Sequence, residues 1–467
     1  MLHSRSHLPL RCLALLLVAL CCAACASRLP PLSASGQAFT PAADEALLWE
    51  RATHEHRKLS RSSALLRDPI LEEYLTDVVH RLLPPGTVEA GVFPSVHVLI
   101  NPSLNSFAYP TGAIYVHSGL LARLENEAQL AAVLAHETAH IVHRHAIRHL
   151  REERNKDFWK RIAVVTTPLV LGPLLAPLGI GLSGANPAIL LQRPSVEDFL
   201  TDQALDSSLG LAARRSRTGR FDQTTALFAR TQPQLALLAS VRNYQQSLME
   251  EADRFVVEAL ARAGYDPEEA DRALGRLHAA ASAQVAQEPF WWGRPTVYEA
   301  RRQALRGALA TFRSSANGKG PQLARVDPYQ ERIRLLLREN ALAELKVGRP
   351  DEAIAQLERI LDLHPNDPVA HYYRGRAYAA KADDDDELQQ AVAAYINATQ
   401  VDAGFAEAYR ELAMTYSKLG DVARAAAARQ TYVSLRGEMA FYPVPGLHGV
   451  SLGPVPLTLP GTANLRP

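Results

Sequence analysis

The chain has 467 residues, 47% of them hydrophobic and 21% charged, which is enough apolar material for roughly two to four domains. Its 50 Lys and Arg residues nearly balance its 49 Asp and Glu residues, so the formal net charge is +1. A chain this close to neutrality has no overall field that would favour a nucleic acid or another polyanion as its partner.

The first 25 residues resemble the signal peptide of a bacterial lipoprotein. Two arginines accompany an apolar stretch, CLALLLVALCC, that is too short for a stable membrane span. Ala23 and Ala24 stand directly before Cys25, as small residues do at a lipoprotein processing site. We therefore expect a lipid anchor on Cys25, and an ordinary secretory signal cut nearby is the alternative.

All four cysteines lie in this first segment, so the predicted mature chain keeps only Cys25. It can form no internal disulfide, and a metal site would have to use histidines and carboxylates. Ala26 stands where an aspartate would favour retention in the inner membrane, so we expect the periplasmic side of the outer membrane. Residues 26–43 are rich in Ser, Ala and Pro and are expected to form a flexible tether.

The next elements are two helical regions separated by two strands. Apolar spacing predicts helix over residues 44–83. Alternating apolar residues predict one strand in VFPSVHVLIN and a second in AIYVHS, with a turn at Pro110 to Gly112 before the second strand. Residues 131–150 contain neither Pro nor Gly and are predicted to form a single helix.

That helix carries the motif HETAH. Residues four apart share a helix face, so His136 and His140 can present two imidazoles to one Zn²⁺. Glu137 is too far around the helix to be a third ligand, but its carboxylate can act as general base towards a water at the metal. His143 shares the face of His136, whereas His145 on an unbroken helix points elsewhere.

In this order, the motifs resemble the HtpX/CAAX-prenyl-protease family of zinc metallopeptidases, and within it the exported BepA-like branch with C-terminal repeats. The matching residues ahead of HETAH are Asn105, Ser106, Phe107, Ala108, Pro110, Gly112, Ile114, Val116, Gly119, Leu120 and Leu121. The resemblance implies one Zn²⁺ and a supporting structural role for His145. It also implies that the strand before the active helix borders the cleft and can pair with an extended substrate.

The resemblance places a third metal ligand on the helix SLMEEADRFVVEALARAG, where relatives carry Glu-x-x-Ala-Asp. Ala252 and Asp253 match, and the resemblance implies that Asp253 orients the ligands. Met249 stands at the ligand position, and a thioether binds Zn²⁺ poorly. Glu250 is the tentative third ligand, although it lies about 100° away around the helix and requires a rotated or bulged helix. We expect Glu251 to be a solvated acid.

A second departure follows this helix. Relatives carry a His-Pro pair shortly before an arginine, but here Arg294 stands in place of the histidine and the arginine comes one residue late, at Arg301. Between the two helices, residues 162–192 contain no charged residue and no histidine, and prolines interrupt them. We expect short buried helices over the domain, with a hairpin that enters the membrane or covers the cleft as the alternative.

The last third of the chain contains a repeat. Ala353 and Ala391 are 38 residues apart, and Ala391 and Ala425 are 34 apart. The longer interval contains four aspartates, Asp383 to Asp386, which we interpret as a solvated inserted loop. The 34-residue period resembles the tetratricopeptide repeat (TPR), whose stacked helix pairs form a concave protein-binding surface.

The sequence therefore predicts an α+β protein: a mainly helical zincin-type metallopeptidase domain with a small sheet, followed by an all-α TPR array. The expected segments are a signal peptide (1–25), a tether (26–43), the peptidase-like domain (44–313), a linker (314–326), three TPRs (327–436) and a Pro-rich tail (437–467). The expected function is zinc-dependent hydrolysis of unfolded or misassembled envelope proteins, with a protein partner docked on the TPRs. The alternative is a catalytically weak pseudo-peptidase that acts as a chaperone or scaffold, which the residues at 249 and 294 favour.

Overall fold

The computed structural model describes residues 29–34, 38–155, 246–283, 295–314 and 329–436. These residues are mainly helical with one three-stranded sheet, which confirms the predicted α+β class. The chain divides into two compact units, Met1–Gln356 and Leu357–Pro467. The signal peptide, residues 162–192, Arg294 and the Pro-rich tail lie outside the described residues. Among the helices that are described, none is long and apolar enough to cross a membrane.

The sheet of the first unit has the strand order β1-β3-β2. Strand β1 (Ser95–Leu99) pairs in parallel with β3 (Ala113–His117), and β2 (Ser106–Ala108) pairs antiparallel with β3 at the edge. The predicted turn before β3 is present, because Gly112 has a φ of +110° and its N–H donates to the carbonyl of Tyr109 at 3.0 Å. Every residue of β3 is buried, so both faces of this strand are covered.

The region predicted as helical over residues 44–83 forms two helices, α2 (Ala43–Leu59) and α3 (Pro69–Leu82). Asp68 begins α3 as its N-cap, accepting the N–H of Leu71 at 3.1 Å, and Pro69 follows at the first helical position. Helix α2 packs through Ala52 and Leu59 onto the sheet face that carries the aromatic side chains of β2 and β3.

The segment before α2 is packed against the domain. Leu32, in the short 3₁₀ helix η1 (Leu32–Ala34), is buried, and Phe39 donates its N–H to the carbonyl of Ala90 at 3.0 Å. The carbonyl of Pro30 accepts from Arg144 at 3.3 Å. The sequence predicted a flexible tether over residues 26–43, whereas residues 29–34 and 38–43 contact the domain through the buried Leu32 and these backbone hydrogen bonds.

Helix α4 (Ser118–Arg123) is followed by α5 (Glu127–Val142), which carries the HETAH motif and is buried along most of its length. The predicted continuous helix over residues 131–150 is wrong, because α5 ends at Val142 and helix resumes only at residues 145–155. Arg144 causes the break with a φ of 56°, and its guanidinium makes a buried ion pair with Glu45 of α2. This pair compensates the strain of a left-handed conformation in a residue other than glycine.

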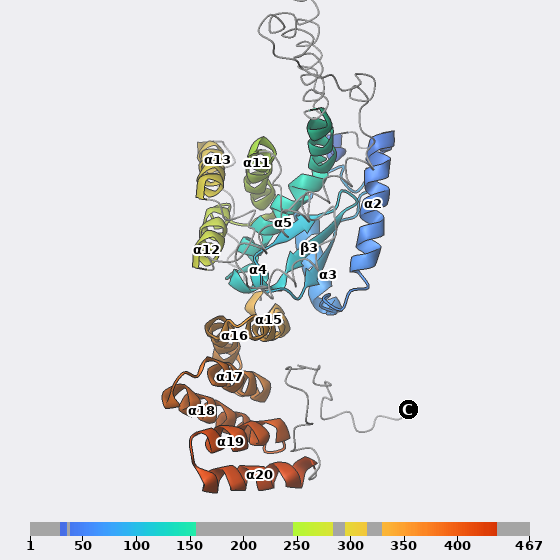
Figure 1. Cartoon of the computed structure of the whole chain (residues 1–467). Helices are drawn as coiled ribbons and strands as arrows, with labels where there is room; N and C mark the ends of the chain where they lie inside the picture. The colour runs from blue at the N-terminus through green and yellow to red at the C-terminus, as the bar shows by residue number, and fades with distance from the viewer. Residues whose placement is uncertain (1–28, 35–37, 156–245, 284–294, 315–328, 437–467) are drawn as a thin grey trace, which may run out of the picture. The chain divides into compact units, whose positions relative to one another are not determined.

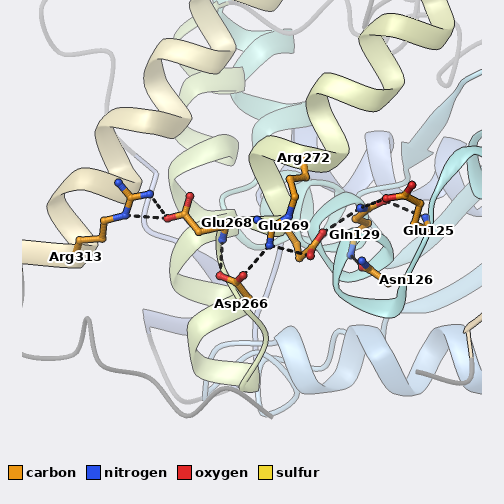
Figure 2. A network of polar contacts seen from close by, with 8 residues as sticks. All are labelled: Glu125, Asn126, Gln129, Asp266, Glu268, Glu269, Arg272 and Arg313. Atoms are coloured by element: carbon orange, nitrogen blue, oxygen red, sulfur yellow. Dashed lines mark hydrogen bonds and ion pairs between the residues drawn. The ribbon is translucent and has the colours of Figure 1, made fainter. Parts of the chain in front are cut away.

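A polar network fixes the first turn of α5 (Figure 2). Asn126 caps the helix by accepting the N–H of Gln129 at 2.8 Å, and the Gln129 amide donates to Glu269 at 3.0 Å. Glu269 begins α12 (Glu269–Ala283), and Arg272 one turn later binds both Glu269 and Asp266. The network therefore fixes the start of the active helix against α12.

Helices α11 (Gln246–Ala263), α12 and α13 (Pro295–Ser314) lie on one side of α5, and α2 lies on the other side of the sheet (Figure 1). Helix α11 packs along α5 and against α13. Asp253 of α11 meets His136, and Glu251 meets His143, so the two helices run in opposite directions where they meet.

The first helices of the predicted repeat region belong to the first unit. They are α14 (Tyr329–Arg332), α15 (Arg334–Lys346) and the start of α16 (Pro350–Leu363). The Tyr329 hydroxyl donates to the carbonyl of Leu121 at 2.7 Å, and Ser118 donates to the buried amide oxygen of Asn340 at 2.6 Å. These helices are thus bonded to α4, inside the compact unit that contains the sheet.

The second unit contains the helix pairs α17 (Pro368–Lys381) with α18 (Asp385–Val401) and α19 (Ala406–Lys418) with α20 (Val422–Arg436). A Cβ on Gly375 of α17 would lie 2.5 Å from the ring of Tyr395, so only glycine allows α17 and α18 to pack this closely. The aspartate run is only partly a loop, because Asp384 caps α18 by accepting the N–H of Asp386 at 2.9 Å and the next two aspartates are in its first turn.

Candidate active site

The site is built on α5, which places two imidazoles in register. His136 and His140 expose only 2% and 5% of their surface. Their Nε2 atoms lie 3.2 Å apart, and a tetrahedral metal ion with bonds of about 2.0–2.1 Å holds two ligand nitrogens about 3.4 Å apart. Burial lowers the pKa of both rings, so both are neutral near pH 7 and have a lone pair available. This pair fits a metal ion without rearrangement.

The outer nitrogen of His136 faces a buried ion pair. Its Nδ1 lies 3.0 Å from Oδ1 of Asp253, and Arg301 donates to the two oxygens of the same carboxylate at 2.7 and 2.9 Å. Burial raises the pKa of Asp253, but the charge and hydrogen bonds of Arg301 hold it well below its usual range. The ionised carboxylate therefore accepts the Nδ1 proton of His136 and leaves Nε2 as the ligand atom. Arg301 reaches this position although the sequence places it one residue late.

Glu137 is 2% exposed and accepts a hydrogen bond from the Ser106 hydroxyl at 2.7 Å. Burial raises its pKa to about 7, while the hydrogen bond from Ser106 opposes the rise. A carboxylate that titrates near neutral pH suits a general base that must also release its proton. Sequence analysis found the Asn105 to Ala108 motif but missed this contact, which joins the edge strand β2 to α5.

The outer nitrogen of His140 faces another histidine. His145 Nδ1 lies 2.8 Å from His140 Nδ1, so the expectation that His145 points away from the site is wrong. The expectation assumed an unbroken helix, and the turn at Arg144 brings the ring of His145 back towards His140.

Glu251 is also different from its prediction as a solvated acid. Its carboxylate lies 3.1 Å from Nδ1 of His143, 2.9 Å from Nη1 of Arg148 and 3.7 Å from Nε2 of His145. The hydrogen bond from His143, with those from its other cationic and imidazole neighbours, holds the pKa of Glu251 well below its usual range. Sequence reasoning missed this group because its partners come from beyond the break in the predicted helix.

Met249 is buried and stands one turn before Asp253 on the same face of α11. Glu250, the tentative third ligand, is not assembled with the two histidines: in the ranges that the structure describes, no group of three or more His, Cys, Asp or Glu residues is arranged to hold a metal. The described site thus offers two imidazoles, and a ligand role for Glu250 stays a prediction.

Comparisons with known proteins agree with this geometry. Residues 69–162, which include the whole HETAH motif, match peptidase family M48, and residues 326–377 match a tetratricopeptide repeat. The chain therefore carries an M48 peptidase domain followed by a TPR, which confirms the family resemblance. Family M48 is a metallopeptidase family, so the match implies a metal cofactor.

Three relatives illustrate the match. The chain is 27% identical over 210 residues to the putative beta-barrel assembly-enhancing protease of Vibrio cholerae, which covers 45% of this chain and 33% of the relative. It is 27% identical over 221 residues to the beta-barrel assembly-enhancing protease of Escherichia coli, covering 47% and 35% respectively. A 51-residue stretch is 49% identical to the mitochondrial metalloendopeptidase OMA1 of Schizosaccharomyces pombe, covering 11% and 15%. The chain spans about a third of the length of the two bacterial relatives.

Proposed function

We propose that this protein is a zinc-dependent metalloendopeptidase of the bacterial envelope that hydrolyses peptide bonds of misfolded or stalled proteins. One observation carries the proposal: two buried neutral imidazoles converge through their Nε2 atoms, 3.2 Å apart, next to a buried carboxylate with a pKa of about 7. The match to peptidase family M48 supports the same chemistry.

His136 and His140 would hold Zn²⁺ through Nε2. When bound, zinc acts as a Lewis acid that polarises the scissile carbonyl and lowers the pKa of water. Ser106 holds Oε1 of Glu137, which leaves Oε2 to take a proton from the attacking water. The same carboxyl then returns the proton to the leaving amine. Asp253 keeps the Nδ1 proton on His136 during both steps.

The substrate would bind as an extended chain. The strand directly before the active helix, β3, was expected to pair with substrate, but in the described sheet it is paired with β1 and β2 on its two sides and has no free edge. Strand β2 is an edge strand of the sheet and carries Ser106, so a peptide paired to β2 would pass by Glu137. Backbone pairing tolerates many side chains, which suits unfolded or misassembled proteins. The TPR helices would dock a protein partner on their concave surface. The names of the bacterial relatives support envelope substrates, since transmembrane β-barrels belong to the outer membrane.

Cys25 would attach the protein to the periplasmic side of the outer membrane through a lipid. The support is the sequence of small residues before Cys25 and the absence of any later cysteine. Replacement Cys25→Ser should move the protein into the soluble periplasmic fraction. A variant that stays in the membrane fraction at unchanged yield would contradict lipid attachment and leave residues 162–192 as the candidate anchor.

A second candidate is a pseudo-peptidase that binds unfolded proteins without cutting them. Its specific support is Met249, which is buried at the ligand position of α11. With two protein ligands instead of three, zinc would bind more weakly and exchange more readily.

A zinc titration and a casein-cleavage assay on the purified chain separate these candidates. The peptidase predicts one zinc per chain and cleavage of casein. Glu137→Gln should keep the zinc and lose about 10²- to 10⁴-fold in rate, because only the proton transfer is removed. Zinc binding without cleavage in the wild type favours the pseudo-peptidase, and failure to bind zinc rejects the metallopeptidase.

A further inference from the structure

The two histidines of the pair are supported by different groups. The Nδ1 of His136 meets the carboxylate of Asp253 directly, at 3.0 Å. The Nδ1 of His140 instead meets Nδ1 of His145 at 2.8 Å, and Nε2 of His145 lies 3.7 Å from Oε2 of Glu251. A row of groups thus runs from the carboxylate on α11 through one imidazole to the other.

The row fixes where the protons lie. Both rings are buried and their Nδ1 atoms lie 2.8 Å apart, so one of these two nitrogens donates and the other accepts. When Nε2 of His140 offers its lone pair to a metal, its proton is on Nδ1 and is donated to Nδ1 of His145. His145 must then carry its own proton on Nε2, on the side that faces the Glu251 carboxylate. An anion at Glu251 favours this arrangement over the reverse one.

Glu251 is itself held in place. Arg148 lies 2.9 Å from Oε2, and Nδ1 of His143 lies 3.1 Å from Oε1. His143, His145 and Arg148 all follow the end of α5 at Val142, so the turn at Arg144 presents three nitrogen-bearing side chains to one carboxylate. This arrangement exists only because the helix is broken there.

We propose that Glu251 and His145 are positioning residues that hold His140 in the tautomer with its proton on Nδ1 and its Nε2 facing the metal. The proposal deepens the proposed function and rests on it, since the ion that His140 binds is taken to be Zn²⁺. Such support matters more in a site that has Met249 where the third metal ligand is expected, because each imidazole then contributes a larger share of the zinc affinity.

Matched variants test the row through the zinc dissociation constant, measured on the full chain by competition with a chelator. Glu251→Met keeps the volume but removes the negative charge that faces His145, and His145→Phe removes the nitrogen that accepts from His140; each should weaken zinc binding by about 10- to 100-fold. Glu251→Gln and His145→Asn keep an acceptor oxygen and should recover part of the loss. Glu258→Gln, on an exposed face of the same helix α11, is the control and should leave the affinity unchanged.

If His145 only filled space, His145→Asn would weaken zinc binding at least as much as His145→Phe. The order of the two zinc dissociation constants therefore separates positioning from packing. Wild-type zinc affinity in both Glu251→Met and His145→Phe would overturn the proposal.

The histidine tautomers of the metal-free chain provide a readout that does not require zinc. With ¹⁵N-labelled histidine, the ring of His140, assigned by its loss in His140→Gln, should have its proton on Nδ1 in the wild type and a mixture of tautomers in Glu251→Met. An unchanged tautomer in Glu251→Met would overturn the proposal even where zinc binds. A wild type that shows the tautomer but binds no zinc would reject the proposed function and leave the positioning row intact.

Discussion

Helices α5 and α11 meet at the same site but contribute to it unequally. Helix α5 carries the complete HETAH motif, with both imidazoles and the carboxylate buried and converging. Helix α11 places Asp253 at 3.0 Å from His136 and Glu251 at 3.7 Å from His145, but has Met249 where a ligand is expected. The comparison teaches that ligand support and ligation are separate roles: α11 places a carboxylate beside His136 in the described structure, whereas its contribution of a third ligand stays a prediction.

The largest effect is expected from Asp253→Asn, which breaks the support that α11 gives to His136. The change leaves the guanidinium of Arg301, 3% exposed, without its opposite charge. Loss of one partner of a buried pair should lower the free energy of unfolding by about 3–5 kcal/mol. Thermal or urea unfolding of the metal-free chain measures this loss.

The matched control is Asp271→Asn on α12. Asp271 also binds an arginine, Arg302 at 3.0 Å, but both side chains are partly exposed. A pair of this kind contributes at most about 1 kcal/mol. Equal unfolding free energies for the two variants would show that the contact between α5 and α11 does not depend on the Asp253 charge.

A smaller effect, in the opposite direction, is expected from Met249→Glu. The new carboxylate would stand on the face of α11 that carries Asp253, and a third ligand should tighten zinc binding about 10- to 100-fold and raise casein cleavage. Without metal the same buried charge should lower the melting temperature, and added zinc should restore it. The zinc titration, the casein assay and the two melting curves measure these effects.

The control Met249→Gln introduces a side chain of the same size as glutamate but without the charge. It should show neither tighter zinc binding nor faster casein cleavage. Equal zinc affinity in the wild type and Met249→Glu, together with loss of zinc in Glu250→Gln, would identify Glu250 as the existing ligand. In that case α11 would contribute a ligand displaced by one residue, and the difference between the two helices would disappear.

The sequence was sufficient for the parts of the site that lie on one element. The spacing of His136 and His140 determines their common helix face, and alternating residues located β1 and β3. It was insufficient for contacts between elements: the bond from Ser106 to Glu137 depends on how β2 packs on α5. Nor did the residues reveal the break at Arg144, because a positive φ in arginine has no sequence signal and its partner Glu45 lies 99 residues earlier in the chain.

The contacts made by whole segments could not be predicted for a related reason. Composition marked residues 26–43 as a tether, yet Leu32 and Phe39 are enough to pack part of it against the domain. The TPR period predicted an array over residues 327–436, but it gave no sign of the buried hydrogen bond from Ser118 to Asn340, which joins α15 to α4. Composition and period describe the average of a segment, whereas a few buried side chains decide what it packs against.

The contact between Arg144 and the carbonyl of Pro30 ties the start of the described chain to the end of α5. If Cys25 carries lipid, only residues 26–29 lie between the lipid-bearing residue and Pro30, beside the end of α5. Even fully extended, the five residue steps from Cys25 to Pro30 span only about 17 Å. The end of α5 beside Pro30 would then be held close to the membrane surface. Chains that emerge from or fail to enter that membrane would be within reach, and proteins free in the bulk periplasm would have to diffuse to it.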